Sequence, residues 1–285
     1  MQSNKKVLIT GAGGYIGRHV VKEFLERGYE VVANDLKFDD IDTRAELSNV
    51  MIFDEAEELY EKLGSPDILV HLAWKNGFVH NSETHMLDLS SHFNFLKKMM
   101  DSGVKMLSVM GSMHEVGYWE GKITEETPCN PLSMYGIAKN SLRQAIFQYG
   151  KNKNITIHWL RGFYICGDDE RGSSIFAKLL QAEKEQKEEF PFTSGKNKYD
   201  FIDLNVLAKQ IVAATLDKNY PGIINVCSGV PVSLAEKVEA FIKSNKLKIR
   251  LKYGAFPDRE YDSPEIWGDA TVINKIMGNI DETIQ

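Results

Sequence analysis

The feature that most constrains the fold of this chain is a glycine-rich segment near its start, TGAGGYIG at residues 10–17. Residues 7–10 are typical of a buried strand, and residues 16–27 carry apolar side chains at helical spacing up to Gly28. Glycines between a strand and a helix permit a tight turn and a close approach to a pyrophosphate, whose charge the helix N-terminus favours. The segment therefore predicts a dinucleotide-binding site, with these candidate residues: Gly11, Gly14, Tyr15, Ile16 and Gly17.

An acidic residue follows the second predicted strand, residues 30–33. At this place Asp35 can accept hydrogen bonds from the ribose hydroxyls of the adenosine, next to Leu36. A carboxylate repels a 2′-phosphate, so the sequence favours NAD(H). Lys37 and Arg44 lie nearby and can offset that charge, which leaves NADP(H) open as the cofactor.

The first half of the chain alternates β-branched runs with amphipathic stretches, which is typical of βαβ units. Because such connections are right-handed, we expect an α/β, Rossmann-type, doubly wound parallel sheet. Its strands are predicted at residues 7–10, 30–33, 50–53, 67–72 and 105–110.

The alternation of strand and helix patterns becomes less regular from about residue 166. We expect a polar helix through the charged run 183–189, a strand at 225–228, and a helix at 234–245 that Ser233 caps. The predicted organisation is a cofactor-binding domain over residues 1–165, rejoined by a segment near 200–225, and a smaller substrate-binding domain over residues 166–285.

Ligands of parallel sheets bind at the carboxyl ends of the strands. This rule adds cofactor-binding candidates from several strand ends: Asp54, Leu72, Ala73, Trp74, Met110 and Phe163. Asp54 could bond the adenine amine, and an ordinary loop carboxylate is the alternative.

Three residues form a candidate catalytic set. Tyr135 and Lys139 in YGIAK share one face of a helix, and Ser112 follows the strand that ends near Met110. A phenol is a poor acid or base near neutral pH unless a neighbouring cation favours its phenolate, so we expect Lys139 to lower the pKa of Tyr135 and also to hold the nicotinamide ribose. Ser112 can hydrogen bond a substrate oxygen.

Taken together, TGAGGYIG, Asp35, the HLA of residues 71–73, Ser112 and YGIAK resemble the extended short-chain dehydrogenase/reductases of the NAD-dependent epimerase/dehydratase family. The LR of residues 160–161 and YDFID at 199–203 extend the resemblance over nearly the whole chain. It implies NAD(P) in the first domain and a nucleoside-diphosphate sugar in the second. The chain looks most like the branch of 4-ketoreductases of dTDP-4-keto-6-deoxyhexoses, of the dTDP-6-deoxy-L-talose dehydrogenase type.

Departures from the family pattern bear on the reaction. The Asp-Glu pair that 4,6-dehydratases carry after the catalytic Ser or Thr is Met113 and His114 here, so dehydration is disfavoured. His114 could face the sugar as an acid–base group or be an ordinary loop histidine. His80, in the loop GFVHNS, could belong to a lid over the substrate or be an ordinary loop histidine. Tyr164 replaces an Asn that contacts the diphosphate, and Tyr199 replaces an Arg. Two other cations then become candidates for neutralising the diphosphate: Lys198 and Arg259.

Three functions remain to be separated. A reductase uses NAD(P)H to reduce a 4-keto sugar nucleotide, with Tyr135 as the proton donor. A 4-epimerase oxidises C4 and reduces it again with the same residues and retains its nucleotide. A nonenzymatic nucleotide sensor needs no Ser112, Tyr135 and Lys139 in catalytic order.

Composition excludes other classes. The formal net charge is −6 and the pI is near 5.7, which disfavours a nucleic-acid partner. No apolar run has the roughly 20 residues of a membrane helix, and three widely spaced cysteines fit a reducing cytoplasm. The resemblance implies a homodimer, built on the helix with Ala138, Leu142, Ala145 and Ile146 and on the apolar segment 93–100.

Overall fold

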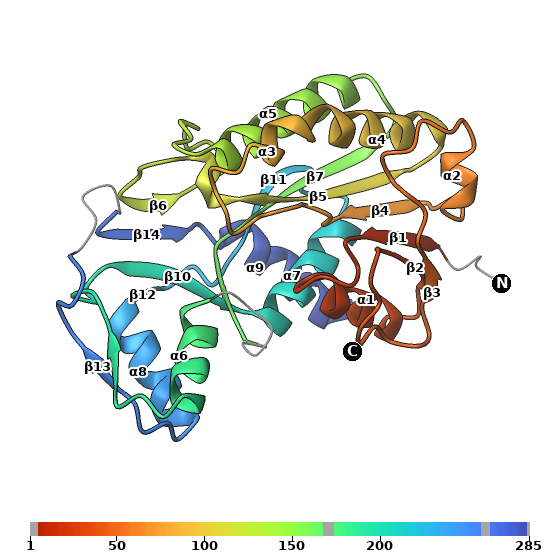
Figure 1. The fold of residues 1–285 in the computed structure, drawn as a ribbon. Coiled ribbons are helices and arrows are strands. Elements are labelled where there is room, and N and C mark those ends of the chain that lie inside the picture. The colour runs from red at the N-terminus through yellow and green to blue at the C-terminus, as the bar shows by residue number, and fades with distance from the viewer. Residues whose placement is uncertain (1–4, 168–173, 258–262, 284–285) are drawn as a thin grey trace.

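The computed structural model describes residues 5–167, 174–257 and 263–283. Its centre is a seven-stranded parallel sheet in the order β11-β7-β5-β4-β1-β2-β3 (Figure 1). Successive strands run outward in both directions from β1 and β4, so the Rossmann-type doubly wound fold is confirmed. The strands are β1 (Lys6–Thr10), β2 (Glu30–Asn34), β3 (Glu46–Ser48), β4 (Ile68–His71), β5 (Met106–Ser112), β7 (Thr156–Gly162) and β11 (Gly222–Val226).

Helices cover both faces of this sheet (Figure 1). One face carries α2 (Leu59–Lys62), α3 (Thr84–Leu87), α4 (Leu89–Ser102) and α5 (Met134–Gly150), and the other carries α1 (Gly17–Glu26), α7 (Leu204–Leu216) and α9 (Thr271–Thr283). Side chains of a strand alternate between the two faces, so Val7 and Ile9 of β1 belong to the core under α1 and α7, whereas Leu8 belongs to the core under α4 and α5.

A second, smaller lobe lies beside the carboxyl ends of the large sheet (Figure 1). It contains α6 (Ile175–Lys184), α8 (Leu234–Ser244), and the strands β8 (Tyr164–Cys166), β9 (Glu189–Pro191), β10 (Lys198–Asp203), β12 (Pro231–Ser233), β13 (Arg250–Lys252) and β14 (Glu265–Gly268). Strand β6 (Gly121–Ile123) joins it through β14. Its own core lies between α6 and α8, around Phe176, Leu179 and Val238.

Asp200 ties the second lobe together. Its buried carboxylate accepts hydrogen bonds from the backbone N–H groups of Ser228, Gly229 and Gly268, at 2.8, 2.9 and 3.1 Å. This one side chain thereby joins β10 to the turn after β11 and to β14.

Three predicted elements differ from the observed ones. The third strand was predicted at residues 50–53 and lies instead at 46–48, because 50–53 runs along a cavity whose wall its apolar side chains form. The helix through the charged run ends at Lys184, and Glu189 already begins β9. The strand predicted at 225–228 is β11 at 222–226, whereas the helix after its Ser233 cap is confirmed.

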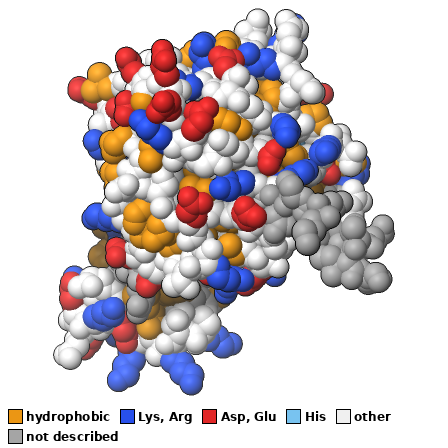
Figure 2. All heavy atoms as spheres, turned by 90° about the vertical axis from the view of Figure 1, so that its right-hand side faces the viewer, with side chains coloured by type: hydrophobic (Ala, Val, Ile, Leu, Met, Phe, Trp, Pro, Cys, Tyr) orange, Lys and Arg blue, Asp and Glu red, His pale blue; other side chains and the backbone are white. Residues whose placement is uncertain are grey.

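On the face shown in Figure 2, acidic and basic side chains are interspersed over most of the surface. Within the described parts of the chain, no helix is long and apolar enough to cross a membrane.

Candidate active site

A cavity of about 2030 Å³ runs along the carboxyl ends of the large sheet and reaches the second lobe. The glycine-rich loop, the ends of β2, β4, β5 and β7, and the first turn of α5 line it. The predicted cofactor-binding residues that line it are Gly11, Gly14, Tyr15, Ile16, Gly17, Asp35, Leu36, Leu72, Ala73, Trp74, Met110, Tyr135, Lys139 and Phe163.

The glycine loop is shaped as a cradle that side chains would fill. Gly11 has φ +70°, and a Cβ there would lie 2.6 Å from the nitrogen of Ala73. A Cβ on Gly17 would lie 2.1 Å from the carbonyl oxygen of Gly11. No side chain caps α1, which begins after Ile16, so its N-terminus is available to an anion.

Asp35 lies at the end of β2, against the glycine loop. One carboxylate oxygen accepts a hydrogen bond from the N–H of Gly13 at 2.9 Å, and the other accepts from Leu36 at 2.6 Å. Asp54, by contrast, accepts a hydrogen bond from the N–H of Ala56 at 3.1 Å and does not line the cavity. The structure thus brings Asp35 to the glycine loop, whereas Asp54 directly follows the cavity-lining residues 50–53 and its carboxylate bonds the backbone of Ala56.

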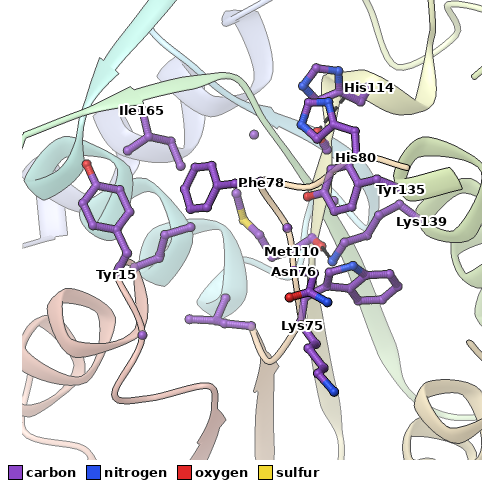
Figure 3. Close-up of a pocket in the computed structure, with 18 of the residues that line it drawn as sticks. Tyr15, Lys75, Asn76, Phe78, His80, Met110, His114, Tyr135, Lys139 and Ile165 are labelled. Carbon is purple, nitrogen blue, oxygen red and sulfur yellow. Dashed lines mark hydrogen bonds between the residues drawn. The ribbon is translucent and has the colours of Figure 1, made fainter. Parts of the chain in front are cut away.

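Tyr15 and the catalytic candidates line opposite sides of the cavity in the view of Figure 3. The hydroxyl of Tyr15 donates a hydrogen bond to the carbonyl of Gly167, which links the glycine loop to the segment after β8. Tyr135 and Lys139 project from the first turns of α5, which begins after Ser133, whose hydroxyl accepts from the N–H of Gly136 at 3.1 Å.

The ammonium of Lys139 is held by two contacts. It donates to the carbonyl of Met110 at 2.8 Å, and it lies 3.7 Å from the centroid of the Trp74 ring (Figure 3 shows Lys139 and Met110). Burial lowers the pKa of Lys139 to about 7, and the charge of Glu115 opposes this shift.

The expected lowering of the Tyr135 pKa by Lys139 is wrong for this geometry. Burial, followed by the charge of Glu115, raises the pKa of Tyr135 to about 12, and a hydrogen bond with Ser112 opposes the rise. The ammonium lies 5.8 Å from the Tyr135 ring and is directed to Met110 and Trp74 instead. Tyr135 is therefore a phenol at neutral pH, the form that donates a proton.

Ser112 is the last residue of β5 and contacts a buried carboxylate, that of Glu115, which sequence reasoning did not identify. Its backbone N–H donates to Glu115 at 2.6 Å, and the indole N–H of Trp159 donates to both oxygens of the same carboxylate at 2.9 Å. Arg161 and Arg143 lie 3.8 and 3.9 Å from it. Burial raises the pKa of Glu115, and these partners oppose the rise.

The Ser112 hydroxyl is oriented by its neighbours. Its oxygen accepts a hydrogen bond from the N–H of His114 at 3.2 Å, so its own proton remains to be donated. Because Ser112 lines the cavity beside Tyr135, that proton can reach a ligand oxygen.

A cluster of aromatic rings and imidazoles surrounds Trp74, and sequence reasoning did not find it. The indole N–H of Trp74 donates to His85 at 3.0 Å, and the ring stacks on His92 with centroids 4.3 Å apart. His92 is hydrogen bonded to His71 at 2.9 Å, which in turn bonds Thr10 at 2.8 Å. Burial lowers the pKa of His92 to about 3 and that of His71 well below its usual range, so both are neutral.

His80 and His114 form the wall above Tyr135. The His80 ring is stacked on the Tyr135 ring with centroids 5.5 Å apart, and His114 lies 4.3 Å from His80 (Figure 3). Burial lowers the pKa of His114 to about 4 and also lowers that of His80. Both imidazoles are neutral at pH 7 and can accept a hydrogen bond there. Met113, the third predicted residue of this wall, lines the cavity too.

Aromatic side chains line the far end of the cavity in the second lobe. The rings of Tyr164 and Tyr199 lie 4.5 Å apart, and Phe201 and Phe176 continue the wall. Of the two basic candidates, the structure describes one. Lys198 is half exposed, pairs with Glu265 at 3.6 Å and does not line the cavity, and Arg259 lies outside the described residues.

Comparisons with known proteins agree with this architecture. Residues 7–227 match the NAD dependent epimerase/dehydratase family. The chain is 45% identical to a dTDP-6-deoxy-L-talose 4-dehydrogenase (NAD(+)) of Aggregatibacter actinomycetemcomitans, over 92% of this chain and 98% of that protein.

More distant relatives share the fold. UDP-arabinose 4-epimerase 1 of Arabidopsis thaliana is 27% identical, over 94% of this chain and 74% of that protein. The solved structure of MoeE5 in complex with UDP-glucuronic acid and NAD superposes with a TM-score of 0.81 at 22% identity, over 96% of this chain and 92% of that one.

Proposed function

Because the chain belongs to the NAD dependent epimerase/dehydratase family, we propose that it is an NAD-dependent oxidoreductase that acts at C4 of a nucleoside-diphosphate sugar. The favoured reaction is reduction of a dTDP-4-keto-6-deoxyhexose, the reverse of the oxidation named for the Aggregatibacter relative. The observation that supports this proposal is that Ser112, Tyr135 and Lys139 line the same cavity as the glycine loop. A nonenzymatic sensor would not need that meeting.

The residues present fit a dinucleotide. The cradle at Gly11 and Gly17 and the uncapped N-terminus of α1 suit a pyrophosphate, and Asp35 suits the adenosine ribose. Leu36, which is 70% exposed beside Asp35, offers no charge to a 2′-phosphate, and this favours NAD(H) over NADP(H). When bound, the nicotinamide supplies the hydride that C4 receives.

Tyr135 and Ser112 handle the oxygen of the substrate. Tyr135 is protonated at neutral pH, so it can donate its proton to O4 as the ketone becomes an alcohol. Ser112 donates a second hydrogen bond to the same oxygen and stabilises the developing negative charge. Lys139 in its protonated form would supply a positive charge near this oxygen and would hold the nicotinamide ribose, and its pKa of about 7 leaves that form partly populated at neutral pH.

Dehydration is disfavoured by the arrangement after Ser112. Met113 and His114 line the cavity, whereas the next carboxylate, Glu115, is fully buried against Trp159 and the two arginines. The two positions directly after Ser112, where the 4,6-dehydratases carry Asp and Glu, therefore present no carboxyl group to the cavity.

We further propose the division into domains at 1–165 with 200–225, and 166–285, because β11 belongs to the large sheet and α7 packs against it while α6 and α8 form their own core. The expected second domain needs one correction, since α9 also packs against the large sheet and so belongs with the first domain. The aromatic wall of Tyr164, Tyr199 and Phe201 would then receive the nucleoside end of the substrate. The three cysteines are free thiols, which suits a cytoplasmic enzyme. A homodimer is proposed from the family resemblance.

The mechanism is tested by three variants assayed with NADH and a panel of nucleoside-diphosphate 4-keto sugars. Tyr135→Phe should lower turnover by about 10² to 10⁴ with nearly unchanged cofactor affinity, because only the proton donor is lost. Lys139→Ala should weaken both turnover and cofactor affinity, and Ser112→Ala should cost less than Tyr135→Phe. Near-normal turnover of Tyr135→Phe with the best substrate would contradict the mechanism.

A 4-epimerase remains the second candidate, since the Arabidopsis relative carries that name. The same residues would serve both reactions, so the cofactor decides between them. A reductase consumes one NADH per product and exchanges it, whereas an epimerase keeps its nucleotide through many turnovers. Product formation without net NADH consumption would favour the epimerase.

A further inference from the structure

The ammonium of Lys139 is buried, with only 2% of the residue exposed. The groups that stabilise its charge are unusual, because among the described residues none of them is a carboxylate in contact. A buried charge requires partners, yet Lys139 forms no ion pair with any residue that the structure describes. Its contacts are the Met110 carbonyl at 2.8 Å and the face of the Trp74 ring, 3.7 Å from the centroid. An ammonium this close to an indole face makes a cation–π interaction.

The Trp74 ring is fixed from two sides. His85 of α3 accepts its N–H at 3.0 Å and is itself hydrogen bonded to the carbonyl of Val79 at 3.0 Å. His92 of α4 stacks on the ring at an interplanar angle of 14°, and His71 of β4 bonds His92 in turn. Two helices and a strand thus determine where the indole face lies.

We propose that Trp74 is a positioning residue for Lys139, holding its ammonium charged and in place through the indole face, with His85 and His92 orienting the ring. The inference rests on the proposed function in so far as Lys139 is catalytic there. It adds a residue that contacts the lysine from outside the Ser112, Tyr135 and Lys139 set.

Other charged and titratable groups around Lys139 cannot replace this contact. Tyr135, on the same helix, is a neutral phenol at pH 7, and His71 and His92 are neutral imidazoles. The carboxylate of Glu115 favours the charged lysine but is directed to Ser112, Trp159 and the arginines. Among the described side chains, Trp74 is therefore the one in contact that stabilises the ammonium charge, beside the backbone carbonyl of Met110.

The Trp74 contact strongly affects the charged fraction of Lys139 near neutral pH. Burial already lowers the pKa of Lys139 to about 7, so a small change in stabilisation decides how much of the lysine is charged. Removing a cation–π contact from a desolvated lysine should lower the pKa of that lysine by about 0.5 to 1.5 units.

The test replaces Trp74 by site-specific incorporation of tryptophan bearing one, two or three fluorines on its six-membered ring. Fluorines withdraw charge from the ring face and keep its size and its N–H, so folding should be preserved. The pKa of Lys139 is read in the full chain from the ¹⁵N and ¹³C shifts of labelled lysine, assigned against Lys139→Arg. We expect the pKa to fall stepwise with fluorine number, by about one unit at three fluorines.

The same series at Trp267, which lies in β14 and does not line the cavity, is the matched control and should leave Lys139 unchanged. A titration of Lys139 that is indifferent to fluorines at Trp74 would overturn the inference. Turnover is measured in parallel near pH 7. If the pKa falls while turnover stays constant, the inference stands and the role proposed for Lys139 is contradicted, so the two failures are distinguishable.

Discussion

Two ionisable side chains at one cavity have pKa values that move in opposite directions because both lose solvation. Burial favours the uncharged form of each, which is the phenol for Tyr135 and the free amine for Lys139. The phenol is useful as it stands, since ketone reduction needs a proton donor. The amine is not, since it must be charged to stabilise a developing oxyanion.

The rate of ketone reduction should accordingly depend on pH through Lys139. Tyr135, with a pKa near 12, stays protonated from pH 6 to 9, whereas Lys139 loses its proton as the pH rises through about 7. We expect kcat/KM to fall toward tenfold per pH unit above that value. In Lys139→Arg the guanidinium stays charged, so the fall should move beyond pH 9 at a lower overall rate. A fall near pH 7 that persists in Lys139→Arg would assign it to another group.

Cofactor preference should depend on Asp35. Asp35→Asn keeps an acceptor for the N–H of Gly13 and removes the charge that opposes a 2′-phosphate. We expect affinity for NADH to fall about tenfold and relative affinity for NADPH to rise, because a hydrogen bond to a charged group contributes roughly 1.5 to 3 kcal/mol. Fluorescence titration with both nucleotides measures this. Asp54→Asn is the matched control outside the cavity, and an unchanged NADH to NADPH ratio in Asp35→Asn would contradict the contact.

Residues with a local signature could be predicted from the sequence, and those with distant partners could not. The glycines, Asp35, Ser112, Tyr135 and Lys139 stand at fixed places around strand and helix ends, so spacing finds them. Glu115 depends on partners such as Trp159 and Arg161, more than 40 residues later in the chain. Lys198 failed as a cavity residue because its position on β10 directs it to Glu265, which spacing does not reveal.

Among the elements, the strand at the sheet edge shows why a hydrophobic pattern can mislead. Residues 50–53, VMIF, are apolar as a buried strand would be, yet they wall the cavity, and Met51 and Phe53 are exposed. The actual edge strand, ELS at 46–48, lacks β-branched side chains and pairs with β2 through its backbone. Apolar surface that serves a ligand is indistinguishable from core in a single sequence.

The loop between β1 and α1 should tolerate no side chain at its last glycine. In Gly17→Ala the Cβ would lie 2.1 Å from the carbonyl oxygen of Gly11 and 2.7 Å from Cα of Ala12, so the turn must open. We expect loss of NADH binding by at least tenfold and a lower melting temperature. Gly278→Ala, in helix α9 with open space around its Cβ, is the control and should gain about 0.5 to 1 kcal/mol of stability. Normal NADH affinity in Gly17→Ala would count against the cradle.

The whole molecule places its chemistry between two lobes with separate cores. Two cores pack against the large sheet, and the third lies between α6 and α8. The cavity between the lobes has the cofactor residues on one side and the aromatic wall on the other. The position of a cleft at strand ends follows from the doubly wound topology, so this much could be predicted. The shape of the second lobe could not, because its short strands pair across distant parts of the chain.

Most of the residues expected at the homodimer interface are buried inside the subunit, including Phe95, Leu96, Met99 and Met100 of segment 93–100, whereas Ala145 and Phe93 are half-buried. Ala138, Leu142 and Ile146 of α5 are completely buried within one subunit, because they pack toward the large sheet. The large apolar side chains that α5 and α3 present to solvent are Met134, Ile137, Met86 and Leu87, which are 37%, 41%, 43% and 71% exposed. We therefore expect a dimer built on these helices to use this second set.

Sedimentation at micromolar concentration should show a dimer, and Ile137→Glu should shift it toward monomer. Full burial of an isoleucine contributes roughly 1.5 to 3 kcal/mol, and a twofold interface buries two copies of it. In the variant the same interface would bury two carboxylates instead, so the dissociation constant of the dimer should increase at least about hundredfold. Val206→Glu is the matched control, since Val206 is 45% exposed on α7 at the opposite face of the sheet. A wild-type protein that sediments as a monomer would refute the dimer, and a dimer that Ile137→Glu leaves intact would place its interface elsewhere. Because Ile137 lies two residues from Tyr135, turnover of the monomeric variant also reveals whether the partner supports the first turn of α5.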